Sequence, residues 1–205
     1  MRNPCHLQKP STSGSIARVS LVPSCVPSRK RGGAIHRSVA LATSLAVLVP
    51  MASLAHADDR LAKESHADRV LVLKGERTLE LLDHGKVLKK YKIALGGKPL
   101  GRKERQGDHK TPEGSYIVDR RNEHSQFYRS LHISYPNAED RRRAQQSGMA
   151  AGGDIMIHGL PNGYGWIGSK HRLRDWTDGC IAVTNEEMDE IWRAVSDGTP
   201  IEIRP

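Results

Sequence analysis

Hydrophobic and polar residues alternate with a period close to two from residue 69 onward. Val70 and Val72 form the first alternating run, Leu79 and Leu81 the second, and a third extends from Lys86 to Leu95. Alternation of this kind indicates strands that bury one face, and the glycine-containing turns between the runs predict tight reversals. The chain immediately after residue 69 is therefore predicted to be an antiparallel meander.

Further short segments continue this pattern, and helices are few. The additional predicted strands are Gly114 to Asp119, Leu131 to Tyr135, Asp154 to His158, Cys180 to Val183 and Pro200 to Arg204. A polar helix is predicted around Ala138 to Gln146, and a second helix after Thr184. Many short strands with few helices predict a mainly β domain.

The helix after Thr184 is specified by its first turn and by its apolar face. Thr184 and Glu187 have the spacing of a capping box, which satisfies two backbone N–H groups at a helix start. Apolar residues then follow with helical spacing: Met188, Ile191, Trp192 and Val195. Gly198 can take the left-handed conformation that ends helices. We expect this helix to pack on the sheet directly after the strand that contains Cys180.

The first 57 residues have the composition of an export signal. Residues 1–37 contain seven Lys or Arg and no acidic residue, and the apolar run Val39 to Leu54 precedes Ala55-His56-Ala57. This order predicts a cleavable secretory signal peptide over residues 1–57, with an uncleaved anchor as the alternative. Pro50 interrupts the apolar run, which is short for a membrane span of ~20 residues, so no stable span is expected after cleavage.

Removal of this leader changes both the charge and the domain plan. The leader holds seven of the 32 Lys and Arg residues and none of the 23 acidic residues, so residues 58–205 carry a net charge of +2. This near-neutral charge gives no reason to expect nucleic-acid binding, which needs clustered basic residues. Residues 58–68 are short and polar and are predicted to be a tether, and residues 69–205 have the length of one domain.

Cys180 is the only cysteine outside the leader, because Cys5 and Cys25 are removed with it. A lone thiol cannot form a disulfide within its own chain, and it is a liability in an oxidising compartment. Cys180 is therefore a candidate nucleophile, and His158, which ends an apolar strand, is a candidate base. Gly179 would let backbone amides approach a substrate oxygen without a Cβ in the way.

Other interpretations of these residues fit less well. A zinc site formed by Cys180, His158 and His171 would not have the paired spacing of zinc motifs. Papain-like peptidases place the cysteine before the histidine in the chain. The glycine-rich segment 96–102 does not end in the Gly-Lys-Ser/Thr of a phosphate loop. The sequence therefore predicts no metal and no cofactor.

Taken together, the motifs resemble the L,D-transpeptidase (YkuD-like) catalytic domain of bacterial peptidoglycan enzymes. His158-Gly159 is similar to the His-Gly of that family, and Thr177 to Cys180 to its Ser/Thr-x-Gly-Cys. Thr111 to Tyr116 resembles its Thr-Pro-x-Gly-x-aromatic segment, and the resemblance covers about residues 69–204. It implies an L,D-transpeptidase-like β-sandwich with few short helices, including one near the C-terminus, as the catalytic domain over residues 69–205.

The resemblance also implies a role for each catalytic residue. Cys180 would attack the carbonyl carbon that follows the L-centre of the third stem residue, release D-alanine and leave a thioacyl enzyme. His158 would act first as base and then as acid, with the carbonyl of Gly159 orienting its ring. Gly179 and Cys180 would supply the amides that bind the oxyanion.

Two positions depart from the family pattern. Asp178 stands where many members have histidine, and Ala182 stands where many have arginine or asparagine. Loop cations are therefore expected to replace the polar group that is missing at position 182. The expected substrate-binding residues are Thr177, Asp178, Arg172, Arg174 and His171.

Three functions follow from this resemblance. The first is a periplasmic L,D-transpeptidase that crosslinks peptidoglycan stem peptides or attaches a protein to the wall. The second is an L,D-amidase or carboxypeptidase that uses the same Cys180 and His158 to hydrolyse stem-peptide or lipoprotein–peptidoglycan bonds, with a wall-attached lipoprotein as a further partner. The third is a wall-binding module without catalysis. The cell envelope is the expected location in each case.

Overall fold

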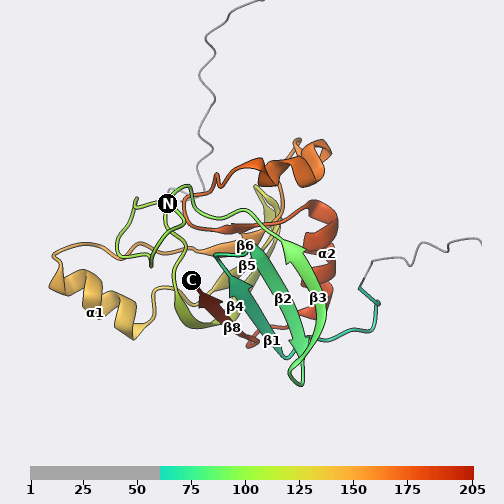
Figure 1. Ribbon diagram of the computed structural model, residues 1–205, viewed down its shortest axis with the longest axis horizontal. Coiled ribbons are helices and arrows are strands. Elements are labelled where there is room, and N and C mark those ends of the chain that lie inside the picture. The colour runs from blue at the N-terminus through green and yellow to red at the C-terminus, as the bar shows by residue number, and fades with distance from the viewer. Residues whose placement is uncertain (1–60) are drawn as a thin grey trace, which may run out of the picture. The chain divides into compact units, whose positions relative to one another are not determined.

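The computed structural model describes residues 61–205, and the predicted signal peptide lies outside them. Within the described residues, eight strands form one sheet in the order β3-β2-β1-β8-β4-β5-β6-β7 (Figure 1). The strands are β1 (Arg69–Leu73), β2 (Thr78–Asp83), β3 (Lys86–Lys92), β4 (Gly114–Ser125), β5 (Tyr128–Ile133), β6 (Met156–His158), β7 (Ile181–Ala182) and β8 (Pro200–Arg204). The prediction of a mainly β fold is confirmed.

The antiparallel meander predicted after residue 69 is β1, β2 and β3, each antiparallel to the next. The complete sheet is mixed, because β8 pairs with β1 in parallel and β7 pairs with β6 in parallel. Both parallel pairs join strands far apart in the chain, which needs a crossover instead of a hairpin. Local alternation therefore predicted the strands but not their partners.

The long strand β4 connects the two halves of the sheet. Its first part, Gly114 to Ile117, pairs with β8, and its second part, from Val118 to Ser125, pairs with β5. Just beyond β3, Ala94 and Ala182 exchange backbone hydrogen bonds of 3.0 and 2.9 Å, so the chain following one edge strand joins the other edge strand, β7. This closure gives the sheet two layers and agrees with the predicted sandwich-like architecture.

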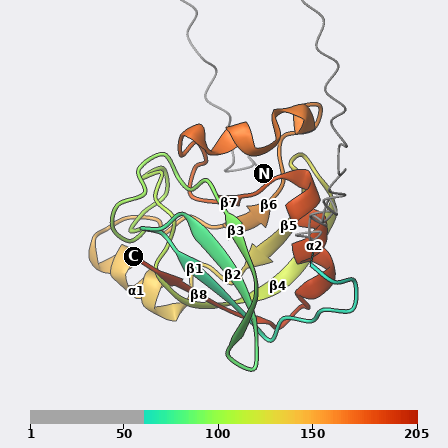
Figure 2. The ribbon, with the colours of Figure 1, turned by 45° about the vertical axis from the view of Figure 1, so that its right-hand side comes forward.

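Three helical segments accompany the sheet: α1 (Ala138–Gln146), the 3₁₀ helix η1 (Gly165–Leu173) and α2 (Asn185–Ala194). In both views α1 and α2 lie on opposite sides of the sheet, and η1, drawn in orange, lies near β6 and β7 (Figures 1 and 2). The range predicted for the first helix matches α1. The 3₁₀ helix was not predicted, because its sequence has six polar or glycine residues among nine and no helical apolar stripe.

Helix α2 begins as its sequence predicts and ends earlier. Thr184 is the N-cap, and the reciprocal capping-box bonds with Glu187 are both present. Met188 and Ile191 are fully buried, as expected for the apolar face. The helix stops at Ala194, and Gly198 takes its positive φ of 89° in the following turn instead of at the helix end.

The hydrophobic core lies between the sheet and α2 and includes side chains from all eight strands and from α2. Its members include Val70, Val72, Leu79, Leu81, Leu131, Ile157, Ile181, Met188 and Ile191. Leu61 and Ala67, from the segment expected to be a tether, also pack into this core. Among the described residues, no helix is long and apolar enough to cross a membrane.

Candidate active site

The turn before β7 presents Cys180, and Thr177 holds that turn. The Thr177 hydroxyl donates to the carbonyl of Cys180 at 2.7 Å and accepts from the N–H of Gly179 at 3.2 Å. Thr177 itself is buried. Its hydroxyl therefore shapes the cysteine turn, whereas the sequence suggested a contact with substrate.

Gly179 is required at its position by both conformation and space. Its φ is +128°, and a Cβ there would lie 2.5 Å from the carbonyl oxygen of Lys110. Any other residue would strain the backbone and collide with a neighbouring segment. Since the N–H of Gly179 donates to Thr177, an oxyanion would have to replace the threonine hydroxyl as its acceptor.

His158 and Cys180 come from neighbouring strands. His158 ends β6, and β7 begins directly after Cys180, with Ile157 opposite Ile181 in parallel register. Adjacent strands lie ~4.8 Å apart, so the two residues occupy the same corner of the sheet. Each residue is also 1% exposed, so the predicted nucleophile and the predicted base are both buried.

The ring of His158 is held in one tautomer. Its Nδ1 lies 2.7 Å from the carbonyl oxygen of Gly159. A carbonyl can only accept, so Nδ1 carries the proton and Nε2 has the lone pair. Phe127 and Trp176 pack against the imidazole, with ring centroids at 4.7 and 5.8 Å, and they fix its orientation. This arrangement makes Nε2 the atom that can take a proton from a thiol.

The thiol of Cys180 donates to the carbonyl of Asp154 at 3.7 Å. Asp154 was predicted to start the strand of His158, but its φ of 54° lies in the left-handed region, and β6 begins at Met156. The bend at Asp154 brings its carbonyl toward the cysteine turn. A strand prediction based on the apolar residues could not show this bend.

A cavity of about 180 Å³ lies beside the cysteine turn, and its lining includes Asp154, whose carbonyl accepts from the Cys180 thiol. It is lined by Lys103, Gln106, Gly107, His109, Gly152, Gly153, Asp154, Ile155 and Asp178. At its wall, Nδ1 of His109 lies 2.7 Å from a carboxylate oxygen of Asp178. An imidazole is thus present beside the cysteine turn, contributed by another segment. Sequence analysis missed His109, whose only signal was its place before the Thr-Pro segment.

The predicted loop cations lie in different settings. Arg172 is paired with Glu187, which is the N3 residue of the α2 capping box, so its charge is directed to the helix start. Arg174 and Lys170 are exposed. Of the two arginines predicted in this loop, Arg174 is therefore the one whose cation is exposed to meet a substrate carboxylate.

His171 is buried on η1 beside Trp176. The indole Nε1–H of Trp176 lies 3.5 Å from Nδ1 of His171, and the ring centroids are 6.5 Å apart. Burial, followed by the positive charges of Arg172 and His158, lowers the pKa of His171 to about 4. His171 is therefore not a solvated loop residue, and its expected role as a substrate-binding residue stays a prediction.

The lowered pKa of His171 predicts an acid-sensitive stability. Between pH 6.5 and about 4 the unfolded chain binds a proton at His171 that the folded chain does not, so the free energy of unfolding falls as pH falls through this window. Full protonation of His171 in the folded chain would lower the free energy of unfolding by ~3 kcal/mol. Urea unfolding of the wild type and of His171→Phe at several pH values measures this, and equal pH slopes would contradict it.

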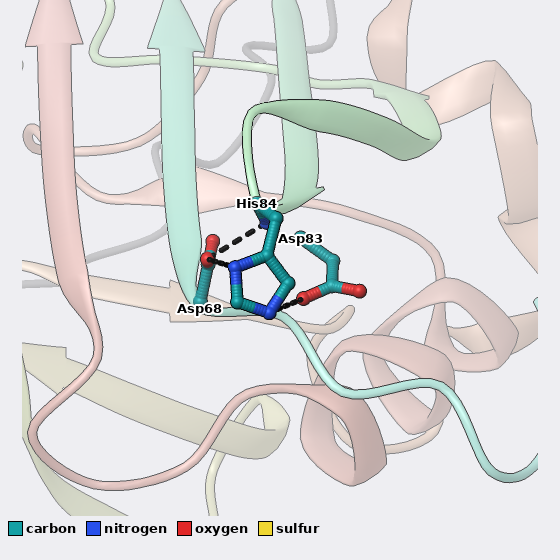
Figure 3. Close-up of side chains that lie close together, drawn as sticks. All are labelled: Asp68, Asp83 and His84. Carbon is teal, nitrogen blue, oxygen red and sulfur yellow. Dashed lines mark hydrogen bonds and ion pairs between the residues drawn. The ribbon is translucent and has the colours of Figure 1, made fainter.

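A separate cluster of potential metal ligands lies at the β2–β3 turn. Asp68, Asp83 and His84 come close together there (Figure 3). The backbone N–H of His84 donates to Asp68 at 2.8 Å, and the histidine side chain is 91% exposed. These solvent-exposed ion pairs explain the cluster without a metal.

Comparison with known proteins shows the family to which this domain is similar. A model of the L,D-transpeptidase catalytic domain, YkuD, matches residues 67–203. The chain is 35% identical over 134 residues to the Escherichia coli K12 protein named "Putative L,D-transpeptidase YafK", and the match covers 62% of this chain and 46% of that protein. The chain thus spans about half the length of the curated relatives it matches.

The solved structures of the helical cell shape determining protein Pgp2 from Campylobacter jejuni are also similar. One superposes with a TM-score of 0.51 at 29% identity, covering 66% of this chain and 46% of Pgp2. The structure of its K307A mutant superposes with a TM-score of 0.52 at 28% identity, and the match covers 72% of this chain and 51% of the mutant chain. Because the family model extends over the whole sheet and includes both strands of the site, the chain belongs to the L,D-transpeptidase (YkuD) catalytic domain family.

Proposed function

We propose that this protein is a cysteine-dependent L,D-transpeptidase of the cell envelope, which acts on peptidoglycan stem peptides through a thioacyl enzyme. The observation that carries the proposal is the tautomer of His158, whose Nδ1–H donates to Gly159 and leaves Nε2 as the base on the strand next to that of Cys180. A buried thiol with an oriented imidazole is the arrangement needed for nucleophilic acyl transfer.

In the acylation step, His158 Nε2 takes the proton from the Cys180 thiol. The sulfur attacks the carbonyl carbon that follows the L-centre of the third stem residue, and a C–S bond forms. Backbone amides at Gly179 and Cys180 bind the oxyanion. The C–N bond then breaks, and D-alanine leaves with the proton returned by His158.

In the second step, His158 removes a proton from the amine of a neighbouring stem. The amine nitrogen attacks the thioacyl carbon, a C–N bond forms and the C–S bond breaks. The thiolate recovers its proton from the imidazolium, and the crosslinked product leaves. The same chemistry would attach a protein amine to the wall.

Hydrolysis is the second candidate, and the cavity beside the cysteine turn favours it. The cavity is about 180 Å³ in volume, and its lining includes His109, Asp178 and Asp154, whose carbonyl accepts from the thiol. A space of this size with polar groups in its wall can hold water near the cysteine turn. Attack by water would make the enzyme an L,D-amidase or carboxypeptidase that acts on stem peptides or on the bond to a wall-attached lipoprotein.

One experiment separates these functions. The purified full-length chain is incubated with muropeptides, and the products are analysed by liquid chromatography and mass spectrometry. Crosslinked dimers indicate transpeptidation, shortened monomers indicate hydrolysis, and a wall-binding module without catalysis gives neither product and no acyl adduct. The control is Cys180→Ala. Fractionation of cells for the processed protein tests export and cleavage after Ala57.

Arg174 is expected to recognise a substrate carboxylate. Its guanidinium is exposed, and an arginine can bind a carboxylate through two hydrogen bonds. We expect Arg174→Gln to raise the Michaelis constant for muropeptide by roughly 10-fold, while alkylation of Cys180 by a small neutral reagent keeps its rate. The matched variant, Arg172→Gln, should mainly lower the free energy of unfolding, because Arg172 binds the α2 cap. An unchanged Michaelis constant in Arg174→Gln would contradict this role.

A further inference from the structure

His171 carries a buried hydrogen-bond donor that no protein group satisfies. The residue is 8% exposed. Within residues 61–205, its Nε2 is one of two buried side-chain nitrogens without a hydrogen-bond partner, the other being Nε of Arg172. Buried polar atoms are almost always partnered in folded proteins, so an exception indicates either a functional group or a missing ligand.

The contact with Trp176 shows which ring nitrogen of His171 carries the proton. Trp176 can only donate from its indole nitrogen, which faces Nδ1 of His171 at 3.5 Å. Nδ1 is therefore the acceptor, and the neutral ring carries its hydrogen on Nε2. The unsatisfied group is thus an N–H that needs an acceptor oxygen.

This donor belongs to the same aromatic cluster as the catalytic base. Trp176 lies between the two imidazoles, with its ring centroid 5.8 Å from that of His158 and 6.5 Å from that of His171. Both ring pairs are edge-to-face.

Because the His171 imidazole is neutral, its Nε2–H favours one kind of acceptor oxygen. Burial and Arg172 keep the imidazole neutral at neutral pH, since its pKa is lowered to about 4. A neutral donor in a buried site suits a neutral oxygen, because a buried carboxylate needs a cation to offset its desolvation, and the adjacent cation, Arg172, already pairs with Glu187. A backbone amide carbonyl meets this requirement.

We propose that the Nε2–H of His171 donates a hydrogen bond to a backbone amide carbonyl of the bound stem peptide and so positions the peptide beside Cys180. This inference rests on the proposed function, because the peptide is the substrate proposed above. It makes His171 a substrate-positioning residue, distinct from the proton transfer performed by His158.

The test measures peptide binding without turnover. A synthetic stem tetrapeptide is titrated by calorimetry into the full-length Cys180→Ala protein, alone and combined with His171→Phe, His171→Gln or His124→Phe. Phenylalanine keeps the ring and removes the donor. Glutamine restores an N–H near the place of Nε2. His124 is an exposed histidine on β4 and serves as the matched control.

We expect His171→Phe to weaken binding by roughly 2- to 10-fold, the net value of one hydrogen bond, and His171→Gln to recover most of that loss. The control should bind as its parent does. His171→Phe should remain folded at pH 7 with an unfolding midpoint close to that of its parent, because it removes the unsatisfied Nε2–H together with the long 3.5 Å acceptor contact of the Trp176 indole. A residue with only a structural role would instead lose stability without a loss of peptide affinity that His171→Gln recovers.

Three results would overturn the proposal. Equal affinity of the parent and His171→Phe would show that no hydrogen bond is made, while leaving the proposed function intact. Loss of the His171→Phe effect when the peptide C-terminus is amidated would show that the acceptor is a carboxylate. No binding by the parent would overturn the proposed substrate, and this inference with it.

Discussion

Replacement of Cys180 by serine is expected to abolish turnover of muropeptides and leave the fold intact. The side chain is buried on the turn before β7, beside a base whose Nε2 is available for the proton. A serine hydroxyl is far less acidic than a thiol, whose pKa in peptides is about 8.5, and the imidazole has no carboxylate behind it, because Gly159 supplies only a carbonyl.

The structural cost of this change should be small. Serine is close to cysteine in volume, and its hydroxyl can donate to the Asp154 carbonyl that now accepts from the thiol. The free energy of unfolding should change by less than ~1.5 kcal/mol, as for other substitutions that conserve volume. Activity lost with the fold preserved would therefore report the chemistry of the sulfur.

Intact-protein mass spectrometry provides the measurement for Cys180. The wild type should gain the mass of an acyl group from muropeptide or from a carbapenem, and Cys180→Ser should gain none. Product analysis of the same samples should show no turnover by the variant. If the wild type forms no adduct and Cys180→Ser remains active, Cys180 is not the nucleophile.

His158→Ala is expected to slow the chemical step by roughly 10²- to 10⁴-fold, the usual contribution of a positioned acid or base. The wild-type imidazole is fixed by Gly159 and by two aromatic rings, so no other orientation competes with the productive one. The variant loses both the base that forms the thiolate and the acid that protonates D-alanine. Substrate affinity should change much less than the rate.

Single-turnover kinetics separates these effects for His158. The rate of acyl-adduct formation should fall at saturating substrate, whereas a matched exposed histidine variant, His66→Ala, should react like the wild type. His171→Ala should affect mainly binding. A larger loss of the acylation rate in His171→Ala than in His158→Ala would mean that the base is on η1.

The candidate nucleophile and base could be proposed from the sequence because their signals are local. Cys180 follows Gly179 in a short motif, and His158 ends an apolar strand that alternation reveals. The capping box of α2 is likewise contained in four consecutive residues, Thr184 to Glu187. Each feature depends on neighbours within a few positions, so the amino-acid order records it directly.

The surroundings of the catalytic pair could not be predicted in this way. Trp176 and Phe127 stack at 6.2 Å around the base, although 48 residues separate them in the sequence. Arg172, expected in the substrate cleft, instead binds Glu187 on the next helix. A charged residue has several possible partners, and only the packing of the elements decides between them.

The sequence alone predicts a mainly β domain, a capped helix after the cysteine strand, and one thiol and one histidine suited to acyl transfer. Burial and capping impose these patterns on consecutive residues, which is why they can be read without coordinates. The tertiary structure alone decided that β6 and β7 are parallel neighbours, that His109 meets Asp178 across 69 positions, and that Nε2 of His171 has no partner. These features depend on contacts between distant segments, and the identity of a single residue carries no record of the partner that folding brings to it.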